Sequence, residues 1–352
     1  MMKYSISSYF VILMLLFSFF SEISSQTGGT HTFDFLNLTN SARVAALGGK
    51  NISLNDNDLN MPFHNPALLT PEMDKNVVLN YVSYFADVNY GYVSYAMDEK
   101  NIGTFAAGMH YINYGTFTAA DPTGLITGNF YAAEYALNLF YSRPIDSAFR
   151  WGVNVKPIFS SLEHYTSSGI ATDLGITYTF DNGLTTIAAV ARNIGFQFKT
   201  YTNNDREPLP FELLLGITKR LEHAPFRVSI TAHDLQQYNL RYNLSEDLDN
   251  YYGIDTTQIT NFSKFTDNLL RHFIFGIEFL PSKSFYISAS YNYQRRSEMA
   301  LVDAPGMVGF SFGAGIKLKR FSFSYGRATL HAAGGSDHFS LTINLSQLYS
   351  RN

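Results

Sequence analysis

Residues 337–345 read Asp-His-Phe-Ser-Leu-Thr-Ile-Asn-Leu, and this stretch decides the fold. Every odd-numbered residue from Phe339 to Leu345 is apolar, and every even-numbered residue from His338 to Asn344 is polar. Alternation with a period of two places successive side chains on opposite faces of a sheet, so the stretch predicts a strand with one apolar and one wet face. A soluble sheet that covers a core has such faces, and so does a barrel wall between lipid and a hydrated lumen.

The same pattern recurs along the chain from Asn76 onward and predicts fourteen strands. They cover residues 77–85, 88–97, 102–116, 131–142, 149–161, 170–180, 184–194, 210–219, 226–233, 272–280, 284–294, 307–318, 321–328 and 337–345. An even number of strands is typical of a closed antiparallel barrel and places both termini at the same end. Pairing of the last strand with the first would then leave no exposed sheet edge.

The connections favour the lipid wall over the soluble sheet. Short turns at 98–100, 181–183, 281–283 and 319–320 alternate with longer connections at 117–130, 162–169, 195–209, 234–271, 295–306 and 329–336. Outer-membrane barrels show this asymmetry, with tight periplasmic turns and longer outer loops. The connection near 86–87 is an exception, because it should be long and is short.

The composition agrees with a chain that meets both lipid and water. Aromatic residues make up 16% of the sequence, whereas charged residues make up only 15%, compared with about 25% in typical globular proteins. The formal net charge of −4 gives no reason to expect a nucleic-acid partner. The absence of cysteine excludes disulfides, thiolate metal sites and cysteine nucleophiles.

The N-terminus predicts export. Lys3 precedes an apolar run from Tyr9 to Phe20, followed by the small polar stretch 21–25. This is the pattern of a secretory signal peptide covering residues 1–25, with cleavage before Gln26. The apolar run is short for an uncleaved membrane anchor, and no later run approaches the roughly 20 residues of a spanning helix. The expected location is therefore the bacterial outer membrane, with both termini in the periplasm.

Residues 26–75 lack strong alternation, and they are predicted to form a compact plug rather than barrel wall, which is assigned to 76–352. A short helix is expected over 41–47, ended by Gly48 and Gly49. Charged or amide side chains on the strands would be costly against lipid, so they are expected to face the lumen. They are Glu134, Asn138, Arg150, Asn154, Lys156, Glu212, Arg227 and Glu278.

The longest outer connection, 234–271, carries a candidate docking site. Residues 256–270 place apolar side chains near helical spacing, which predicts a short amphipathic helix presenting Phe262, Phe265 and Leu269. Such a helix can either cover the barrel mouth or bind a partner.

No motif indicates an enzyme. None of the nine histidines lies in a His-Glu-x-x-His pattern, and the sequence has no Gly-x-Ser-x-Gly elbow. Glycine pairs lie in or beside strands, without the following helix that a phosphate loop needs. The sequence therefore predicts no catalytic, cofactor-binding or metal-binding residues.

The mature N-terminus resembles a known family. Phe33-Asp-Phe-Leu-Asn-Leu38, Ser41-Ala-Arg-Val-Ala-Ala-Leu-Gly-Gly49 and Asn65-Pro-Ala-Leu-Leu69 are similar to the PorQ family of the Bacteroidota type IX secretion system. The segment 41–49 and Asn65-Pro66-Ala67 are also similar to PorV and the wider FadL-like barrel group. The resemblance implies an all-β, fourteen-stranded transmembrane barrel with its N-terminal segment in the lumen. Arg43, Gly48, Gly49, Asn65 and Pro66 match the family motif, with structural roles.

For function, the resemblance implies a non-enzymatic part of the cell-surface attachment complex. The barrel would hold PorZ beside PorU and PorV, where secreted cargo is attached to lipopolysaccharide. The alternative is a FadL-like transporter of hydrophobic small molecules, with Leu36, Leu38 and Leu47 lining a pocket at the plug. A third hypothesis is a general porin. The predicted plug argues against it, because the plug could block the lumen.

Overall fold

A computed structural model of the chain describes residues 31–85, 88–180, 182–202, 206–241, 261–300, 306–331 and 334–349. The chain divides into two units, 1–30 and 31–352, and everything that follows concerns the second. The predicted signal peptide and the first part of the predicted helix at 256–270 lie outside the described residues. Among the described residues, no helix combines the length and the apolar character needed to cross a bilayer.

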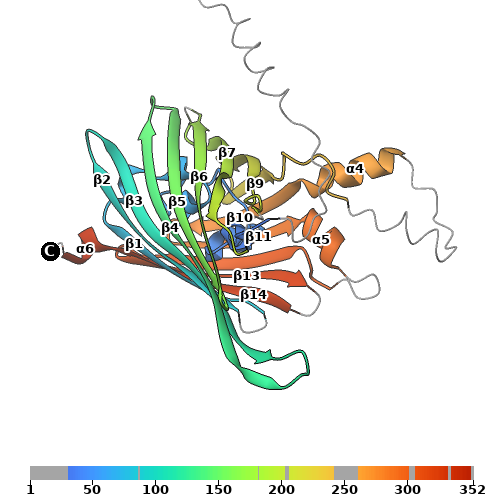
Figure 1. The fold of residues 1–352 in the computed structure, drawn as a ribbon. Helices are drawn as coiled ribbons and strands as arrows, with labels where there is room; N and C mark the ends of the chain where they lie inside the picture. The colour runs from blue at the N-terminus through green and yellow to red at the C-terminus, as the bar shows by residue number, and fades with distance from the viewer. Residues whose placement is uncertain are drawn as a thin grey trace, which may run out of the picture. The chain divides into compact units, whose positions relative to one another are not determined.

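The second unit is a closed antiparallel barrel of fourteen strands (Figure 1). The strands are β1 (Asn76–Ser83), β2 (Asn89–Glu99), β3 (Gly103–Ala120), β4 (Ile126–Pro144), β5 (Phe149–Leu162), β6 (Tyr165–Thr179), β7 (Thr185–Lys199), β8 (Glu212–Arg220), β9 (Phe226–Ala232), β10 (Phe273–Ser282), β11 (Phe285–Asn292), β12 (Phe310–Lys317), β13 (Phe321–His331) and β14 (Gly334–Asn344). Each predicted strand overlaps one of these, in order. The predicted fold class is therefore confirmed.

Strand β14 closes the barrel as its alternation predicts. It pairs with both β13 and β1, and Leu341 lies opposite Leu79 in the register with β1. Phe339 is 38% exposed on the outer face, whereas its neighbour His338 is 2% exposed and points inward. The outer wall carries exposed apolar side chains around the barrel, among them Val93, Leu215 and Ile277.

Several connections differ from the sequence prediction. Strands β3 and β4 run through most of the predicted loop 117–130, and β6 starts at Tyr165, inside the predicted loop 162–169. These predictions were wrong because the strand ends are rich in Gly, Thr and Ser and lack an apolar face, so alternation does not mark them. The connection between β1 and β2 is short, at residues 84–88.

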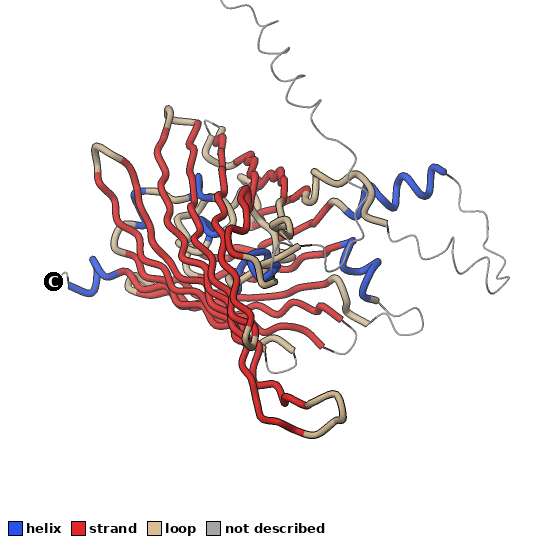
Figure 2. The backbone as a smooth tube through the Cα atoms, in the orientation of Figure 1, coloured by secondary structure: helices blue, strands red, loops and turns tan. Residues whose placement is uncertain are grey.

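Three helices belong to the described connections and the C-terminus. Helix α4 (Asn261–Arg271) lies where the sequence predicts it, in the connection between β9 and β10. Helix α5 (Tyr293–Met299) was not predicted, and the side chain of Asn292 caps it by accepting a hydrogen bond from Arg295 N. Helix α6 (Leu345–Tyr349) follows β14 and lies at the opposite end of the barrel from α4 and α5 (Figure 2).

Residues 31–75 fill the lumen. They form η1 (Asp34–Asn37), α2 (Ala42–Ala46), η2 (Met61–Phe63), η3 (Pro66–Leu68) and η4 (Pro71–Met73), and we call this segment the plug. Ser41 caps α2 by accepting a hydrogen bond from Val44 N, and the helix ends before Gly48 and Gly49 at φ of 94° and 96°. An added Cβ at Gly48 would lie 2.3 Å from Ile274 Cγ2 of the wall, so both backbone and space require glycine there.

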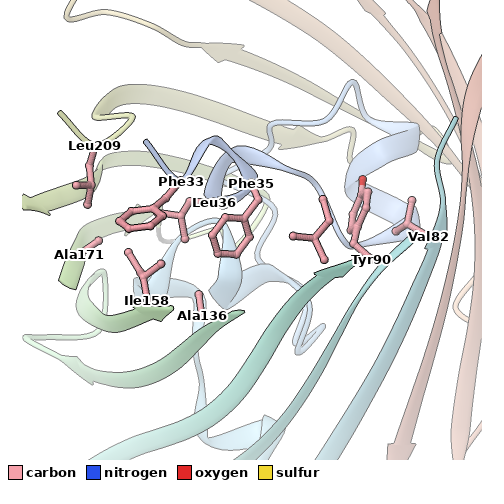
Figure 3. Packing of buried hydrophobic residues seen from close by; sticks show 10 residues of the cluster. Phe33, Phe35, Leu36, Val82, Tyr90, Ala136, Ile158, Ala171 and Leu209 are labelled. Carbon is pink, nitrogen blue, oxygen red and sulfur yellow. The ribbon is translucent and has the colours of Figure 1, made fainter. Parts of the chain in front are cut away.

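The apolar core lies between the plug and the inner face of the wall. In Figure 3, Phe33, Phe35 and Leu36 of the plug point toward Ala136 and Ile158 of β4 and β5. A second cluster joins other plug residues to β1, β2, β3 and β4, with Phe63 packed edge-on against Tyr92. Burial of these side chains stabilises the plug in its place, because the hydrophobic effect favours removing them from water.

Candidate functional site

Arg43, on the plug helix α2, is the centre of a buried ion-pair network. Its guanidinium lies 2.6 Å from Asp56 of the plug and 2.8 Å from Glu278 of strand β10. The guanidinium carbon also lies 4.4 Å from the centre of the Tyr286 ring, which adds a cation–π contact. The side chains of Arg43 and Glu278 are both 1% exposed. The network therefore joins the plug to the wall through charges that water does not screen.

Further cations from the wall complete this network. Arg227 on β9 lies 3.1 Å from Asp56 and 3.2 Å from Glu278, and Lys317 on β12 lies 3.2 Å from Asp56. Burial alone would lower the pKa of Arg43, but Asp56 and Glu278 raise it well above its ordinary value. Burial alone would raise the pKa of Asp56, but Arg43 and its neighbours lower it well below the usual range. Both groups are consequently ionised over all ordinary pH values.

A second ionic contact holds the plug at Lys50. Its Nζ lies 2.5 Å from Glu212 Oε1, 3.4 Å from His233 Nδ1 and 3.4 Å from Asp234 Oδ2. These three wall and loop residues offer ligand atoms within 4.8 Å of one another, a spacing that suits a metal ion. The Lys50 ammonium supplies the positive charge at their centre. Glu212, His233 and Asp234 therefore bind the ammonium group of the plug lysine. The sequence pattern did not reveal this contact, because Lys50 is distant from the three residues along the chain.

The contact with Lys50 shifts the pKa of the Asp234 carboxylate. Burial would raise its pKa, but Lys50 and His233 lower it well below its usual value. Burial would lower the pKa of Lys50, but Asp234 and Glu212 raise it above its ordinary value. The ion pair is therefore present at neutral pH.

Asn65 and Pro66 shape the turn that packs against strands β5 and β6. The Asn65 side chain donates to Ile52 O at 2.8 Å and accepts from Ala67 N at 2.9 Å. An added Cβ at Gly152 of β5 would lie 2.4 Å from the Pro66 carbonyl, so the plug backbone touches the wall backbone here. All five family-motif residues thus lie at plug contacts or turns, where they shape and hold the plug.

Phe262, Phe265 and Leu269 lie on helix α4, away from the plug. They are 78%, 51% and 45% exposed and follow helical spacing along one face. The opposite face is anchored, since Asn268 bonds to Tyr238 O and Leu240 N, and Asp267 pairs with Arg241. We call the three exposed side chains the α4 stripe. The α4 stripe is an apolar surface, and the contacts of Asn268 and Asp267 on the other face hold the helix in position.

The predicted lumen-facing polar residues contact the plug or other polar side chains of the wall. Arg150 donates to Leu69 O at 3.3 Å, and Lys156 lies 2.6 Å from Asp173 inside the barrel. The three leucines considered for a transport pocket divide between two clusters. Leu36 belongs to the cluster in Figure 3 and Leu38 packs against it, whereas Leu47 packs with Val44 and Met61.

Comparisons with known proteins support the fold. No protein-family description matches the chain, and no curated protein matches it either. The toluene transporter TbuX of Ralstonia pickettii is 12% identical, with a TM-score of 0.51 over 87% of this chain and 98% of that one. The toluene transporter TodX of Pseudomonas putida is 13% identical, with a TM-score of 0.49 over 87% and 96%. A FadL homologue of Pseudomonas aeruginosa is 10% identical, with a TM-score of 0.49 over 87% and 98%. At 12% identity the likeness to TbuX shows a shared barrel fold.

Proposed function

We propose that this chain is a non-enzymatic barrel of the bacterial outer membrane that serves as a scaffold for a surface protein. The outward apolar side chains and the closed sheet support a membrane location, because a closed barrel satisfies its backbone hydrogen bonds within lipid. We place the end with α6 in the periplasm and the end with α4 and α5 outside the cell.

The observation that carries the scaffold function is the plug's attachment to the wall. Two separate ionic contacts, at Arg43 and at Lys50, and two apolar clusters hold residues 31–75 inside the barrel. Buried ion pairs that lose one partner are costly, so displacement of this plug is unfavourable. A lumen filled in this way suits a rigid support better than an open channel.

The α4 stripe is the proposed contact with the partner. By the resemblance of the plug motif, the partner would be PorZ, in a type IX secretion attachment complex with PorU and PorV that links cargo to lipopolysaccharide. Exposed apolar residues on an anchored helix match the helix-in-groove mode of recognition.

Co-purification from native membranes tests this function. Replacement of Phe262, Phe265 and Leu269 by Ser should leave the barrel inserted, because all three are exposed, and should remove the surface partner from the purified complex. Lys264→Ser, another exposed position on α4, is the matched control and should retain the partner. Equal recovery of the partner with both variants would exclude the α4 stripe as the contact.

A second candidate function is transport of hydrophobic small molecules. The fold comparison supports it more directly than it supports the scaffold, because TbuX is a toluene transporter. The aromatic cluster around Phe33 and Phe35 is an apolar surface at the start of the plug that a small hydrocarbon can contact (Figure 3). Liposomes containing the pure protein should take up toluene faster than empty liposomes if the protein transports it, and at the same rate if it is a scaffold only.

A further inference from the structure

Strands β3 and β4 extend beyond the rest of the wall as a two-stranded ribbon. Figures 1 and 2 show this ribbon projecting well past the neighbouring strands. Residues 116–120 of β3 pair with 126–131 of β4, and the turn between them is closed by Asp121. A register shift after Asn113, with Gly115 at φ of 87°, separates the ribbon from the barrel wall. Such bulges bend a strand and re-aim its continuation.

Both outer edges of the ribbon are unpaired among the described residues. Strand β2 pairs with β3 only as far as Asn113, and β5 pairs with β4 only as far as Ala132. The last contact on the β5 side is Glu163 N, which donates to Tyr131 O at 3.2 Å. Free edges of this kind present a row of backbone donors and acceptors that can pair with another strand.

The hydrogen bond from Glu163 N to Tyr131 O shows which way the backbone N–H and C=O groups of the ribbon point. In an antiparallel pair, the N–H and C=O of one residue point to the same edge. Tyr131 O points toward β5, so Asn129, two residues away, also points its backbone groups to this outer edge. Thr116 and Thr118 lie opposite Tyr131 and Asn129, and they point theirs to the other outer edge. Phe117 and Phe130 lie between these pairs and bond to each other instead.

The side chains of the ribbon are largely exposed and, apart from Asp121 in its turn, uncharged. Asp121 is the only Asp, Glu, Lys, Arg or His between residues 114 and 131, and its carboxylate accepts bonds from Thr123 and Leu125 of its own turn. Leu125, Ile126 and Tyr131 are exposed. Phe117 stacks on Phe130 with ring centres 5.1 Å apart. Apart from the Asp121 turn, the ribbon thus offers an uncharged surface that includes Thr and aromatic residues.

We infer that this ribbon binds an extended segment of the surface partner by adding it as a further strand, an assignment that rests on the proposed scaffold function. An extended peptide satisfies both the apolar side chains and the free backbone groups. Lipid contacts only the side chains and leaves the N–H and C=O groups unpaired, which is costly. Asp121 leaves one negative charge at the turn of the ribbon, so the segment should carry no acidic residue there and can contain the Lys or Arg at which trypsin cuts. The β3–β4 and β9–β10 connections lie at the same barrel end, so one partner can contact both the ribbon and the α4 stripe.

Hydrogen exchange of residues 114–131 tests which molecule, if any, binds the ribbon. It is measured in native outer-membrane vesicles, in vesicles treated with trypsin, and in the purified full-length protein. Trypsin cannot cut the ribbon, which has no Lys or Arg. Strand addition by a surface protein predicts protection in untreated vesicles only. Protection that survives trypsin indicates a lipid surface, protection in the purified protein indicates a second copy, and exchange that is fast in all three samples indicates no occupant; each of these results overturns the inference.

Proline variants test the edges separately. Thr118→Pro and Asn129→Pro each remove an outward N–H while leaving the β3–β4 bonds intact, whereas Thr118→Val and Asn129→Val keep it. At least one proline variant should lower partner recovery about tenfold relative to its valine control, consistent with loss of a backbone bond and steric block of the edge. If wild type recovers the partner and all four variants do so equally, the ribbon assignment is wrong and the scaffold function stands. If wild type itself recovers no surface protein, the scaffold function fails.

Discussion

Replacing Arg43 with Met should loosen the plug without unfolding the barrel. The change removes the cation that bridges Asp56 and Glu278, while the methionine side chain still fills part of the space. Glu278 is 1% exposed and would keep only Arg227 as a cationic partner. Removing one partner of a buried ion pair typically costs about 3–5 kcal/mol. Because each 1.4 kcal/mol is a factor of ten, the open state of the plug should become at least about a hundredfold more populated.

Hydrogen exchange of the α2 amides measures this opening directly, since exchange reports local unfolding. Arg43→Met should accelerate exchange in α2 by at least about a hundredfold and leave the strand amides unchanged. Lys317→Met is the matched control, because Lys317 is one-third exposed and its ion pair within the described part of the chain is with Asp56, so its loss should cost less than about 1 kcal/mol. Adding Glu278→Gln to Arg43→Met should recover part of the protection, because it removes a buried carboxylate that has lost Arg43 and keeps Arg227. Equal α2 exchange in Arg43→Met and Lys317→Met would refute the view that the buried network holds the plug.

Three further predictions concern the wall, the plug contact and pH. Leu341→Arg should impair barrel assembly by about 2–4 kcal/mol, whereas Thr342→Arg, on the inner face, should be better tolerated, as measured by the heat-dependent gel shift of the folded barrel. Gly326→Ala should accelerate exchange in α2, because the new Cβ would lie 2.0 Å from a plug carbonyl oxygen, and Gly334→Ala, with no neighbour within 4 Å, should not. Because the pKa of Asp234 is lowered, its ion pair with the plug lysine should persist from pH 8 to pH 5 and weaken only below about pH 4, seen as a rise in bilayer conductance.

The barrel could be predicted from the sequence because its wall obeys one simple rule. An apolar outer face and a polar inner face impose an alternation of period two on each strand, and residues 337–345 show it clearly. The rule fails where the strands leave the wall. The ribbon residues 116–120 are Thr-Phe-Thr-Ala-Ala, whose side chains are exposed or half-buried on both faces, so the sequence predicts a loop there while the backbone continues as strand.

The plug contacts could be predicted only in part. The paired glycines and Asn65-Pro66 mark turns through local backbone chemistry, which a sequence shows. The wall partners of Arg43 and Lys50, Glu278 and Glu212, are separated from them by more than 160 residues, and only the barrel register brings them together. Asp56 lies in an Asn- and Asp-rich stretch that resembles a solvated loop, yet its carboxylate is the point where three cations meet.

The plug and the outer end bear on the two candidate functions in different ways. Transport through the lumen requires the Arg43 and Lys50 contacts to break and reform in each cycle, or a path through the apolar cluster that leaves them intact. A scaffold requires neither, since the plug then acts as a fixed core that sets the strand positions. The α4 stripe and the ribbon edges are exposed features at one end of the barrel, where the proposed partner would contact them. A protein that only passed hydrocarbons would gain nothing from free strand edges, which favour aggregation unless they are paired or covered. These edges are therefore the feature that most favours a docking function over transport alone.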